Sequence, residues 1–263
     1  MNTKPDDDIL LRADTDGITT LTLNRPAARN ALSMGLMTAL QTEIDAIAGD
    51  PSVRVVVIAA NGPAFCAGHD LREVRGTPTR PAYEALFAQC SALMLSITRL
   101  PQPVIARVHA TATAAGCQLV ATCDLAVAAE TAHFATPGVN IGLFCSTPMV
   151  AVSRNMGRKQ TMEMLLTGDM IDAEAARAGG LINKVVPAAD LDDAVAAYTR
   201  QIASKSALTL KIGKEAFYRQ LEMPLEDAYA YASEVMVTNM LARDAGEGID
   251  AFLEKRPPQW TGE

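Results

Sequence analysis

Two short segments of small residues have a composition suited to holding a negatively charged oxygen through main-chain N–H groups. They are Ala67-Gly68 and Ala115-Gly116, and each follows an apolar run and precedes a presumed helix. Small residues let the backbone approach a ligand closely, and the first turn of a helix carries N–H groups without intrahelical partners. Two such segments that converge would form an oxyanion hole. The same residues are also expected where strands and helices only pack closely, and the spacing leaves both interpretations open.

The two segments belong to a weak internal repeat. A shift of 48 residues places Val55 to Ile58 over Pro103 to Ala106, the first small-residue pair over the second, and Leu71 over Leu119. Each copy reads as a strand, a small-residue loop and a helix start. The repeat therefore predicts that the two loops follow equivalent strands.

Few side chains near these loops can transfer a proton or bind a metal. His69 leaves the first loop with an ordinary pKa near neutrality, so it is either an acid-base group or a residue whose backbone alone matters. Cys145 is either a weak acid and nucleophile or an inert packed thiol. Asp124 and Asn140 are polar, and we expect a structural hydrogen-bonding role for Asp124. The five cysteines are scattered without a CxxC spacing, which predicts reduced thiols and no metal site.

The first third of the chain alternates between strand and helix patterns. A hairpin is predicted from Ile9 to Leu23 with a turn at Thr15 to Gly17, and a helix with Ser33 as its N-cap follows. Val53 to Ala60 is apolar throughout, as expected of a strand buried on both faces. Val104 to Val108 predicts a second such strand, and Pro81 to Arg99 an amphipathic helix after a surface loop, residues 75–80. An α/β or α+β architecture follows.

From Thr147 onward the strand signal nearly vanishes and helical patterns dominate. The last 70 residues carry many large apolar side chains, including Tyr229, Met236, Phe252 and Leu253. Such residues must pack on the main body or on another subunit, so the pattern indicates oligomerisation.

Charge and hydropathy narrow the class of partners. The chain has 263 residues and a net charge of -7, from 23 Lys plus Arg against 30 Asp plus Glu, which argues against a nucleic-acid partner. No apolar run approaches the roughly 20 residues that span a bilayer, so we predict no membrane insertion. The opening MNTKPDDDIL has neither a secretory nor a transit-peptide pattern. A cytoplasmic location is therefore predicted.

Five motifs occur along the chain, and they are NRPAARNALS (24–33), FCAGHDL (65–71), PVIARVHATATAAGCQLVATCD (103–124), MEMLLTGDMIDAEAARAGGLINKVV (162–186) and FLEKRPPQW (252–260). With these motifs in this order, the chain resembles the enoyl-CoA hydratase/isomerase (crotonase) family. The ATAAGCQL and FATPGVNIGLFCSTP stretches are similar to those of one subgroup. The resemblance implies an α/β fold, a spiral of repeated β-β-α units with a C-terminal helical layer. Residues 1–195 would form the spiral core and residues 196–263 a helical trimerisation segment.

The resemblance also implies a site. The oxyanion hole would consist of the main-chain N–H groups of His69 and Ala115, with a thioester carbonyl oxygen between them. Coenzyme A would bind as part of an acyl-CoA substrate, with no permanently bound cofactor. The residues expected to contact it in the same subunit are Ala27, Arg29, Ala64, Ala67, Gly68, Asp70, Leu71 and Arg72. Phe252 and Lys255 would come from a neighbouring subunit of a homotrimer or a dimer of trimers. Arg72 would supply charge for a phosphate, and the alternative for it is a solvated surface arginine.

The chain departs from the family at both positions where its hydratases carry a glutamate. Gln118 and Gly138 stand there, and the usual glycine-rich turn reads Phe144 to Pro148. Hydration needs one group that takes a proton from water and another that delivers a proton to the α-carbon. An amide and a glycine do neither near neutral pH. The two-glutamate hydration mechanism is therefore not expected.

Two functional hypotheses follow from the retained loops and the missing acids. The first is a lyase or isomerase, of the kind found in fatty acid metabolism, that acts on acyl-CoA thioesters through the oxyanion hole with unusual acid-base groups. The second is a non-catalytic acyl-CoA binding or assembly subunit. A serine peptidase on a related spiral fold is a third idea, and it lacks a nucleophilic serine in a suitable context.

Overall fold

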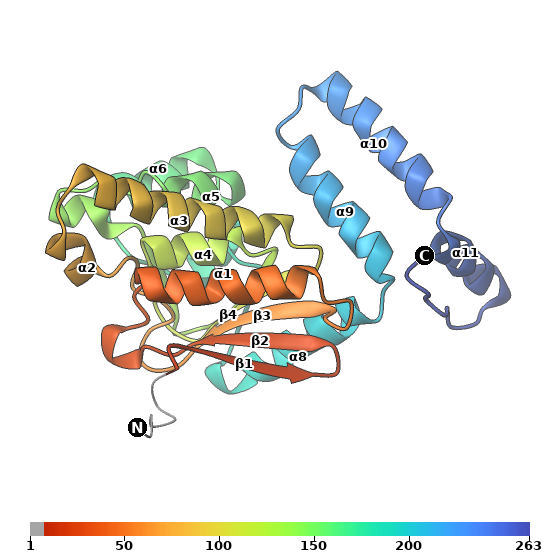
Figure 1. Ribbon diagram of the computed structural model, residues 1–263, viewed down its shortest axis with the longest axis horizontal. Coiled ribbons are helices and arrows are strands. Elements are labelled where there is room, and N and C mark those ends of the chain that lie inside the picture. The colour runs from red at the N-terminus through yellow and green to blue at the C-terminus, as the bar shows by residue number, and fades with distance from the viewer. Residues whose placement is uncertain (1–7) are drawn as a thin grey trace.

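The chain folds around a six-stranded sheet covered by helices on both faces, with a helical arm beyond it (Figure 1). This computed structural model describes residues 8–263. The sheet has the order β1-β2-β3-β4-β6-β9, and a second sheet has the order β5-β7-β8. The predicted α/β class is confirmed. Most of the N-terminal segment from which the absence of a targeting signal was predicted lies outside the described residues.

The N-terminal hairpin forms where the alternating pattern predicted it. Strands β1 (Leu10–Thr15) and β2 (Ile18–Leu23) pair antiparallel around the turn. The short helix η1 (Pro26–Ala28) and helix α1 (Met34–Ala48) follow. Ser33 caps α1, because its hydroxyl accepts a hydrogen bond of 3.1 Å from the Leu36 N–H.

The centre of the main sheet is parallel and buried on both faces. It consists of β2, β3 (Val55–Ala60), β4 (Val104–Val108), β6 (Leu125–Ala129) and β9 (Lys184–Val186). Side chains of β3 alternate between two cores. Val56 and Ile58 face α1, α3 (Arg80–Arg99) and α4 (Ala115–Thr122), whereas Val55 and Val57 face α8 (Leu191–Ala203). This alternation explains the unbroken apolar run.

The internal repeat coincides with the register of the sheet. Val56 pairs with Val104 and Ile58 with Ala106, so partners in β3 and β4 are 48 residues apart (104 minus 56). Equivalent positions of the two copies are thus side by side. The loops that follow β3 and β4 consequently leave the same edge of the sheet next to one another.

The second sheet lies where the small-residue loops run. It contains β5 (Ala112–Thr113), β7 (His133–Ala135) and β8 (Ile171–Asp172), and an isolated bridge joins Cys66 to Ala112. The remaining short elements are α2 (Leu71–Gly76), η2 (Pro137–Ile141), α5 (Pro148–Asn155), α6 (Arg158–Thr167), α7 (Ala173–Gly179) and η3 (Ala188–Asp190). Along the chain, strands of the two sheets therefore alternate with helices.

Three details differ from the sequence expectations. Residues 75 and 76 of the predicted surface loop are the last two residues of α2, which begins after its N-cap Asp70. The region after Thr147, where the sequence predicts almost no strands, still contains β9, and the three residues of β9 pair only with β6. The division predicted after residue 195 falls inside α8, which continues against the sheet through Tyr198 and Ile202. The part of the chain that leaves the core begins at α9.

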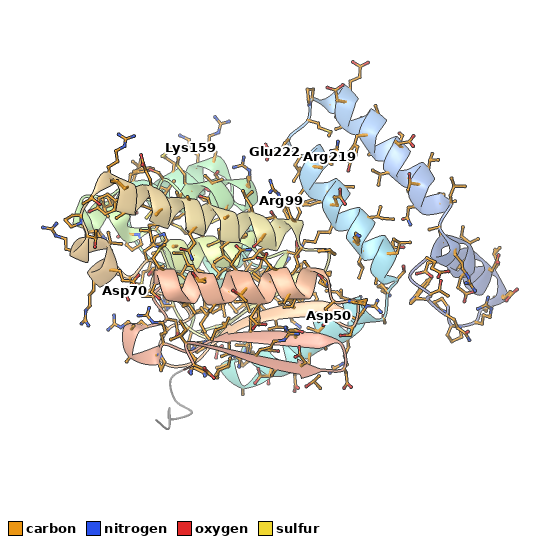
Figure 2. All side chains as sticks on the ribbon, viewed as in Figure 1. Asp50, Asp70, Arg99, Lys159, Arg219 and Glu222 are labelled. Carbon is orange, nitrogen blue, oxygen red and sulfur yellow. The ribbon has the colours of Figure 1, made fainter. Side chains whose placement is uncertain are left out.

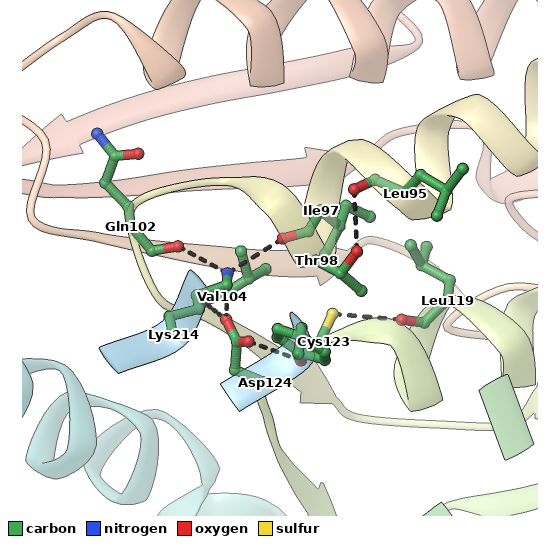
Figure 3. Close-up of polar contacts among 10 residues, drawn as sticks. Leu95, Ile97, Thr98, Gln102, Val104, Leu119, Cys123, Asp124 and Lys214 are labelled. Carbon is green, nitrogen blue, oxygen red and sulfur yellow. Dashed lines mark hydrogen bonds and ion pairs between the residues drawn. The ribbon is translucent and has the colours of Figure 1, made fainter. Parts of the chain in front are cut away.

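The arm consists of α9 (Ala207–Gln220), α10 (Leu225–Met240) and α11 (Arg243–Glu254). A buried polar cluster attaches it to the core (Figure 3). Lys214 Nζ on α9 lies 2.6 Å from Asp124 Oδ2 and donates to the carbonyl oxygens of Ile97 and Gln102, each at 3.0 Å. Tyr218 donates to Asp124 Oδ1 at 2.8 Å. The predicted structural role of Asp124 is confirmed.

Beyond α9 the arm exposes much apolar surface. Leu241 and Phe252 are 83% and 82% exposed, and Leu225, Tyr229 and Leu253 are also exposed. Among residues 8–263, no helix has the length and apolarity needed to cross a membrane.

Candidate active site

The two small-residue loops are bound to each other by main-chain contacts. The Thr113 N–H donates to the Cys66 carbonyl oxygen at 2.9 Å, and the Phe65 N–H donates to the Thr111 carbonyl oxygen at 3.0 Å. A Cβ atom at Gly116 would lie 2.1 Å from the Cys66 carbonyl oxygen, so only glycine lets the start of α4 approach the first loop this closely. The loops predicted to converge are therefore in direct contact.

The main-chain N–H groups of His69 and Ala115 are both left without an acceptor among residues 8–263. His69 forms an isolated parallel β-bridge with Leu32. The Leu32 N–H donates to the Gly68 carbonyl oxygen at 2.8 Å, and the Asp70 N–H donates to the Leu32 carbonyl oxygen at 3.2 Å. In such a bridge the N–H of the central residue points to the opposite side. Ala115 is the first residue of α4, where an N–H has no intrahelical acceptor. Both groups are thus available to a ligand.

The distance between the loops is short on the side of these N–H groups. A Cβ atom built at Gly68 would lie 3.5 Å from the Ala115 nitrogen and 2.8 Å from Ala114 Cβ. Ala114 itself adopts φ 51° and ψ −120°, a backbone conformation that is unfavourable for a side chain. Such strain persists only where the surroundings impose it, and it is common at functional sites.

The side chains of His69 and Gln118 both reach α3. The His69 ring meets Phe87 edge to face, with centroids 5.7 Å apart, and neither ring nitrogen has a hydrogen bond of regular geometry within the described part of the chain. Gln118 is buried, and its Oε1 lies 4.0 Å from Cys90 Sγ. Phe87 and Cys90 are one helical turn apart, so they share a face of α3. The ring and the amide are therefore directed at the same stretch of helix.

The thiols around the loops are protonated near neutral pH. All five cysteines are unpaired and buried. Burial raises the pKa of Cys66 to about 12 and that of Cys90 to about 11. Burial also raises the pKa of Cys145, which favours the inert packed thiol over the nucleophile. Within residues 8–263, no group of three His, Cys, Asp or Glu side chains is arranged to hold a metal ion.

The turn after η2 closes over Gly138. A Cβ atom there would lie 2.6 Å from the Leu143 carbonyl oxygen and 2.9 Å from Cys145 Sγ. One of these contacts is to backbone, which cannot move aside as a flexible side chain can. A glutamate at this position would consequently require the whole turn from Gly142 to Cys145 to shift.

Introducing a glutamate at Gly138 and at Gln118, one position at a time, is expected to separate these two environments. Gly138→Glu should lower the free energy of unfolding by about 1–3 kcal/mol, because it overpacks the turn. Gln118→Glu keeps the size of the side chain, so its cost comes from burying a carboxyl group and should shrink once acidic pH protonates that group. Urea denaturation of the two variants and the parent protein, at neutral and at acidic pH, measures the difference. A cost at Gly138 that vanished at acidic pH would contradict the steric closure there.

The segments expected to contact coenzyme A meet at the same end of the sheet. The Ala67 N–H donates to the Arg29 carbonyl oxygen at 3.1 Å, and the Asn30 amide donates to the Ala64 carbonyl oxygen at 2.8 Å. Ala64 and Gly68 are buried. The exposed members of the set are Ala27, Arg29, Ala67, Leu71 and Arg72. Neither of these two arginines forms an ion pair with any described residue.

Asp70 has a different environment from the rest of that set. Its carboxylate pairs with Arg25 at 2.9 Å and accepts from the Arg72 N–H at 3.1 Å as the N-cap of α2. Burial opposes ionisation, yet the Arg25 hydrogen bond and these neighbours lower the pKa of Asp70 overall. Figure 2 places Asp70 beside the start of α1. The side chain therefore fixes the loop, and its backbone is what remains for a ligand.

Phe252 and Lys255 are not brought to this end of the chain. They lie in and directly after α11, which is at the opposite end of the molecule from α2 (Figure 1). Phe252 is almost fully exposed. A role in the same subunit's site is thus excluded by distance, and the prediction that they serve a neighbouring subunit stays a prediction.

Comparison with known proteins decides the family. The enoyl-CoA hydratase/isomerase family model matches residues 13–263. The chain belongs to this family. Enoyl-CoA hydratase domain-containing protein 3, mitochondrial, from human is 47% identical over 94% of the chain and 82% of its own length, and the rat protein of that name is 46% identical with the same coverage. A crystal structure of an enoyl-CoA hydratase from Mycobacterium smegmatis has a TM-score of 0.95 and 55% identity, covering 97% of this chain and 99% of that one.

These relatives bear on three predictions. The predicted membership of the enoyl-CoA hydratase/isomerase family is confirmed. The resemblance to one subgroup is also confirmed, and that subgroup is enoyl-CoA hydratase domain-containing protein 3. The crotonase-like fold is confirmed by the structural match. The predicted cytoplasmic location is wrong on this comparison, because the human and rat relatives are both mitochondrial by name. The prediction depended on ten N-terminal residues, whereas the similarity lies along the rest of the chain.

Several residues of the site had no signal of their own in the sequence. Phe87 and Cys90 belonged to a predicted amphipathic helix, and their three-residue spacing could have placed them on one face. Nothing local indicated that this face meets His69 and Gln118. The strained conformation of Ala114 was likewise hidden, because alanine rarely adopts a positive φ.

Proposed function

We propose that this protein binds acyl-CoA thioesters and holds the thioester carbonyl oxygen between the N–H groups of His69 and Ala115. The observation that carries the proposal is the pair of contacting loops, each presenting an N–H without an acceptor in the described chain. Donors fixed before the substrate arrives stabilise the negative charge that develops on a carbonyl oxygen. Membership of the enoyl-CoA hydratase/isomerase family supports a lyase or isomerase reaction on such thioesters.

The coenzyme A portion would lie over the turn after β2 and the loop before α2. Arg29 and Arg72 are exposed there without ion-pair partners among the described residues, and guanidinium groups suit phosphate oxygens. Ala27, Ala67, Gly68 and Leu71 would line the surface between them. This arrangement supports coenzyme A as part of the substrate.

A second copy of the chain would complete the site. Large apolar side chains are exposed on α10 (Leu225), between the two helices (Leu241) and on α11 (Phe252 and Leu253), which suits burial against another subunit. A homotrimer or a dimer of trimers would cover them and would bring Phe252 and Lys255 to a neighbour's coenzyme A. Residues from α9 onward then act as the trimerisation segment.

A non-catalytic acyl-CoA binding subunit is the second candidate. The closed turn at Gly138 supports it, because the resemblance implies a glutamate at this position and a side chain there would meet the Leu143 carbonyl oxygen and Cys145 Sγ. In both candidate functions the protein binds and polarises the thioester carbonyl. They differ in whether the protein also transfers a proton to or from the acyl group.

The polarisation can be measured without knowing the reaction. Infrared difference spectroscopy of butyryl-CoA labelled with ¹³C at the carbonyl should give a lower carbonyl stretching frequency on binding. Ala115→Pro removes one donor and suits the first position of α4. It is made together with Ala114→Gly, because the Ala114 Cβ would crowd the proline ring, and Ala114→Gly alone is the control.

The control should bind with the full frequency shift, and the double variant should lose most of it. A bound thioester with an unshifted carbonyl in the parent protein would refute the oxyanion hole. Failure to bind butyryl-CoA at all would refute the proposed function. Light scattering on the same preparations should give three or six times the 27.9 kDa chain mass.

A further inference from the structure

The imidazole of His69 is a buried polar group without a well-formed hydrogen bond. Both ring nitrogens are enclosed, and neither has a hydrogen-bond partner of regular geometry among residues 8–263; burial lowers the pKa of the ring by more than the nearby Leu32 backbone raises it. One contact of the ring is the edge-to-face one with Phe87. Buried polar atoms are nearly always hydrogen-bonded in folded proteins, so an exception requires a reason. A ligand that supplies the missing partner is such a reason.

The ring is fixed close to where the thioester would lie. Hydrogen bonds on both sides of His69 hold its backbone to Leu32, so the side chain leaves a rigid loop. Phe87 also lines an open groove of about 790 Å³ along α3, together with Arg80, Tyr83, Glu84, Ala88 and Ser91. Phe87 touches both the ring and this groove, so an acyl chain that ran from the oxyanion hole to the groove would pass near the imidazole. Carbon 2 of the acyl group, next to the carbonyl carbon, would be the first atom on that path.

Among residues 8–263, the other candidate proton acceptors near the ring are neutral or form ion pairs. Gln118 cannot take a proton, and the neighbouring thiols of Cys66 and Cys90 stay protonated near neutral pH. Asp70 is paired with Arg25. Glu84, the carboxylate that lines the groove beside Phe87, is solvent-exposed and forms an ion pair with Arg80 at 2.7 Å. Burial lowers the pKa of His69 below its ordinary 6.5, so the ring is neutral and unprotonated on one nitrogen near pH 7.

We propose that the His69 imidazole is the catalytic base that removes a proton from carbon 2 of the bound acyl-CoA. The inference rests on the proposed function. The C2–H bond breaks, the proton moves to the unprotonated ring nitrogen, and the electron pair forms a C1–C2 double bond. The negative charge moves to the thioester oxygen, where the N–H groups of His69 and Ala115 hold it. Return of the proton restores the thioester, and in D2O the ring returns a deuteron.

The test is the exchange of the C2 protons of butyryl-CoA in D2O, followed by mass spectrometry. His69→Gln keeps the backbone N–H and offers a donor and an acceptor, but it cannot carry a proton. We expect its exchange rate to fall by about 100-fold or more, the usual contribution of a general base. Its affinity for butyryl-CoA, measured by calorimetry, should stay within about twofold of the parent. His133→Gln, at an exposed histidine, is the control and should exchange at the parent rate.

The pH profile provides a second readout that a structural role would not change. The parent exchange rate should rise with pH up to a pKa below 6.5 and then level off, as the ring loses its proton. His69→Gln should lack this rise. Equal exchange by His69→Gln and parent, or binding of butyryl-CoA without any exchange, would overturn the inference and leave the proposed function standing. Absence of binding would overturn both.

Discussion

Lys214→Met is expected to lower the free energy of unfolding by about 3–5 kcal/mol, the usual effect of breaking a buried ion pair by removing one partner. The Lys214 side chain is 8% exposed, and it loses Asp124 and the carbonyl oxygens of Ile97 and Gln102 together. The substitution leaves the Asp124 carboxylate with its two hydrogen bonds, from Tyr218 and the Val104 N–H, but without a countercharge. Because Lys214 joins α9 to the core, the arm should detach first.

Urea denaturation of the parent and the variant measures this loss. Lys211→Met is the matched control, since it removes a lysine from an exposed position on the same helix and should change stability by less than about 0.5 kcal/mol. Equal stability of the two variants would mean that the buried cluster does not hold the arm. The result matters for function, because α9 leads to the helices that carry Phe252 and Lys255.

Gly116→Ala is expected to damage stability and the oxyanion hole together. The added Cβ would lie 2.1 Å from the Cys66 carbonyl oxygen and 2.8 Å from its carbonyl carbon, so two stretches of backbone must separate. Overpacking of this kind costs about 1–3 kcal/mol. The separation also moves the Ala115 N–H away from that of His69. The infrared shift of a bound thioester carbonyl should therefore shrink or vanish.

The control for this substitution is another glycine on a helix. A Cβ at Gly213, in α9, meets no heavy atom within 4 Å. Gly213→Ala should raise stability by about 0.5–1 kcal/mol, because alanine favours the helix more than glycine does. Gly116→Ala with normal stability and a normal carbonyl shift would show that the two loops need not touch for the site to form.

The elements of the fold were largely predictable because their signals are local. The alternation of β2, the apolar run of β3 and the Ser33 cap each depend on neighbours in the chain. The breaks near Gly157 and Pro224 became helix boundaries for the same reason. Short β9 was missed, since three residues carry too little periodicity and its pairing with β6 is non-local.

The order of the motifs and the 48-residue repeat were enough to indicate the family and to place two small-residue loops after equivalent strands, because residue type and spacing are properties of the chain itself. The contact of Gly116 with Cys66, the closed turn over Gly138 and the unpartnered ring of His69 were decided by tertiary structure alone. Each of these depends on which distant backbone or side chain lies within a few ångströms. Such proximity arises only when the sheet, α3 and α4 have packed, and no local pattern encodes it.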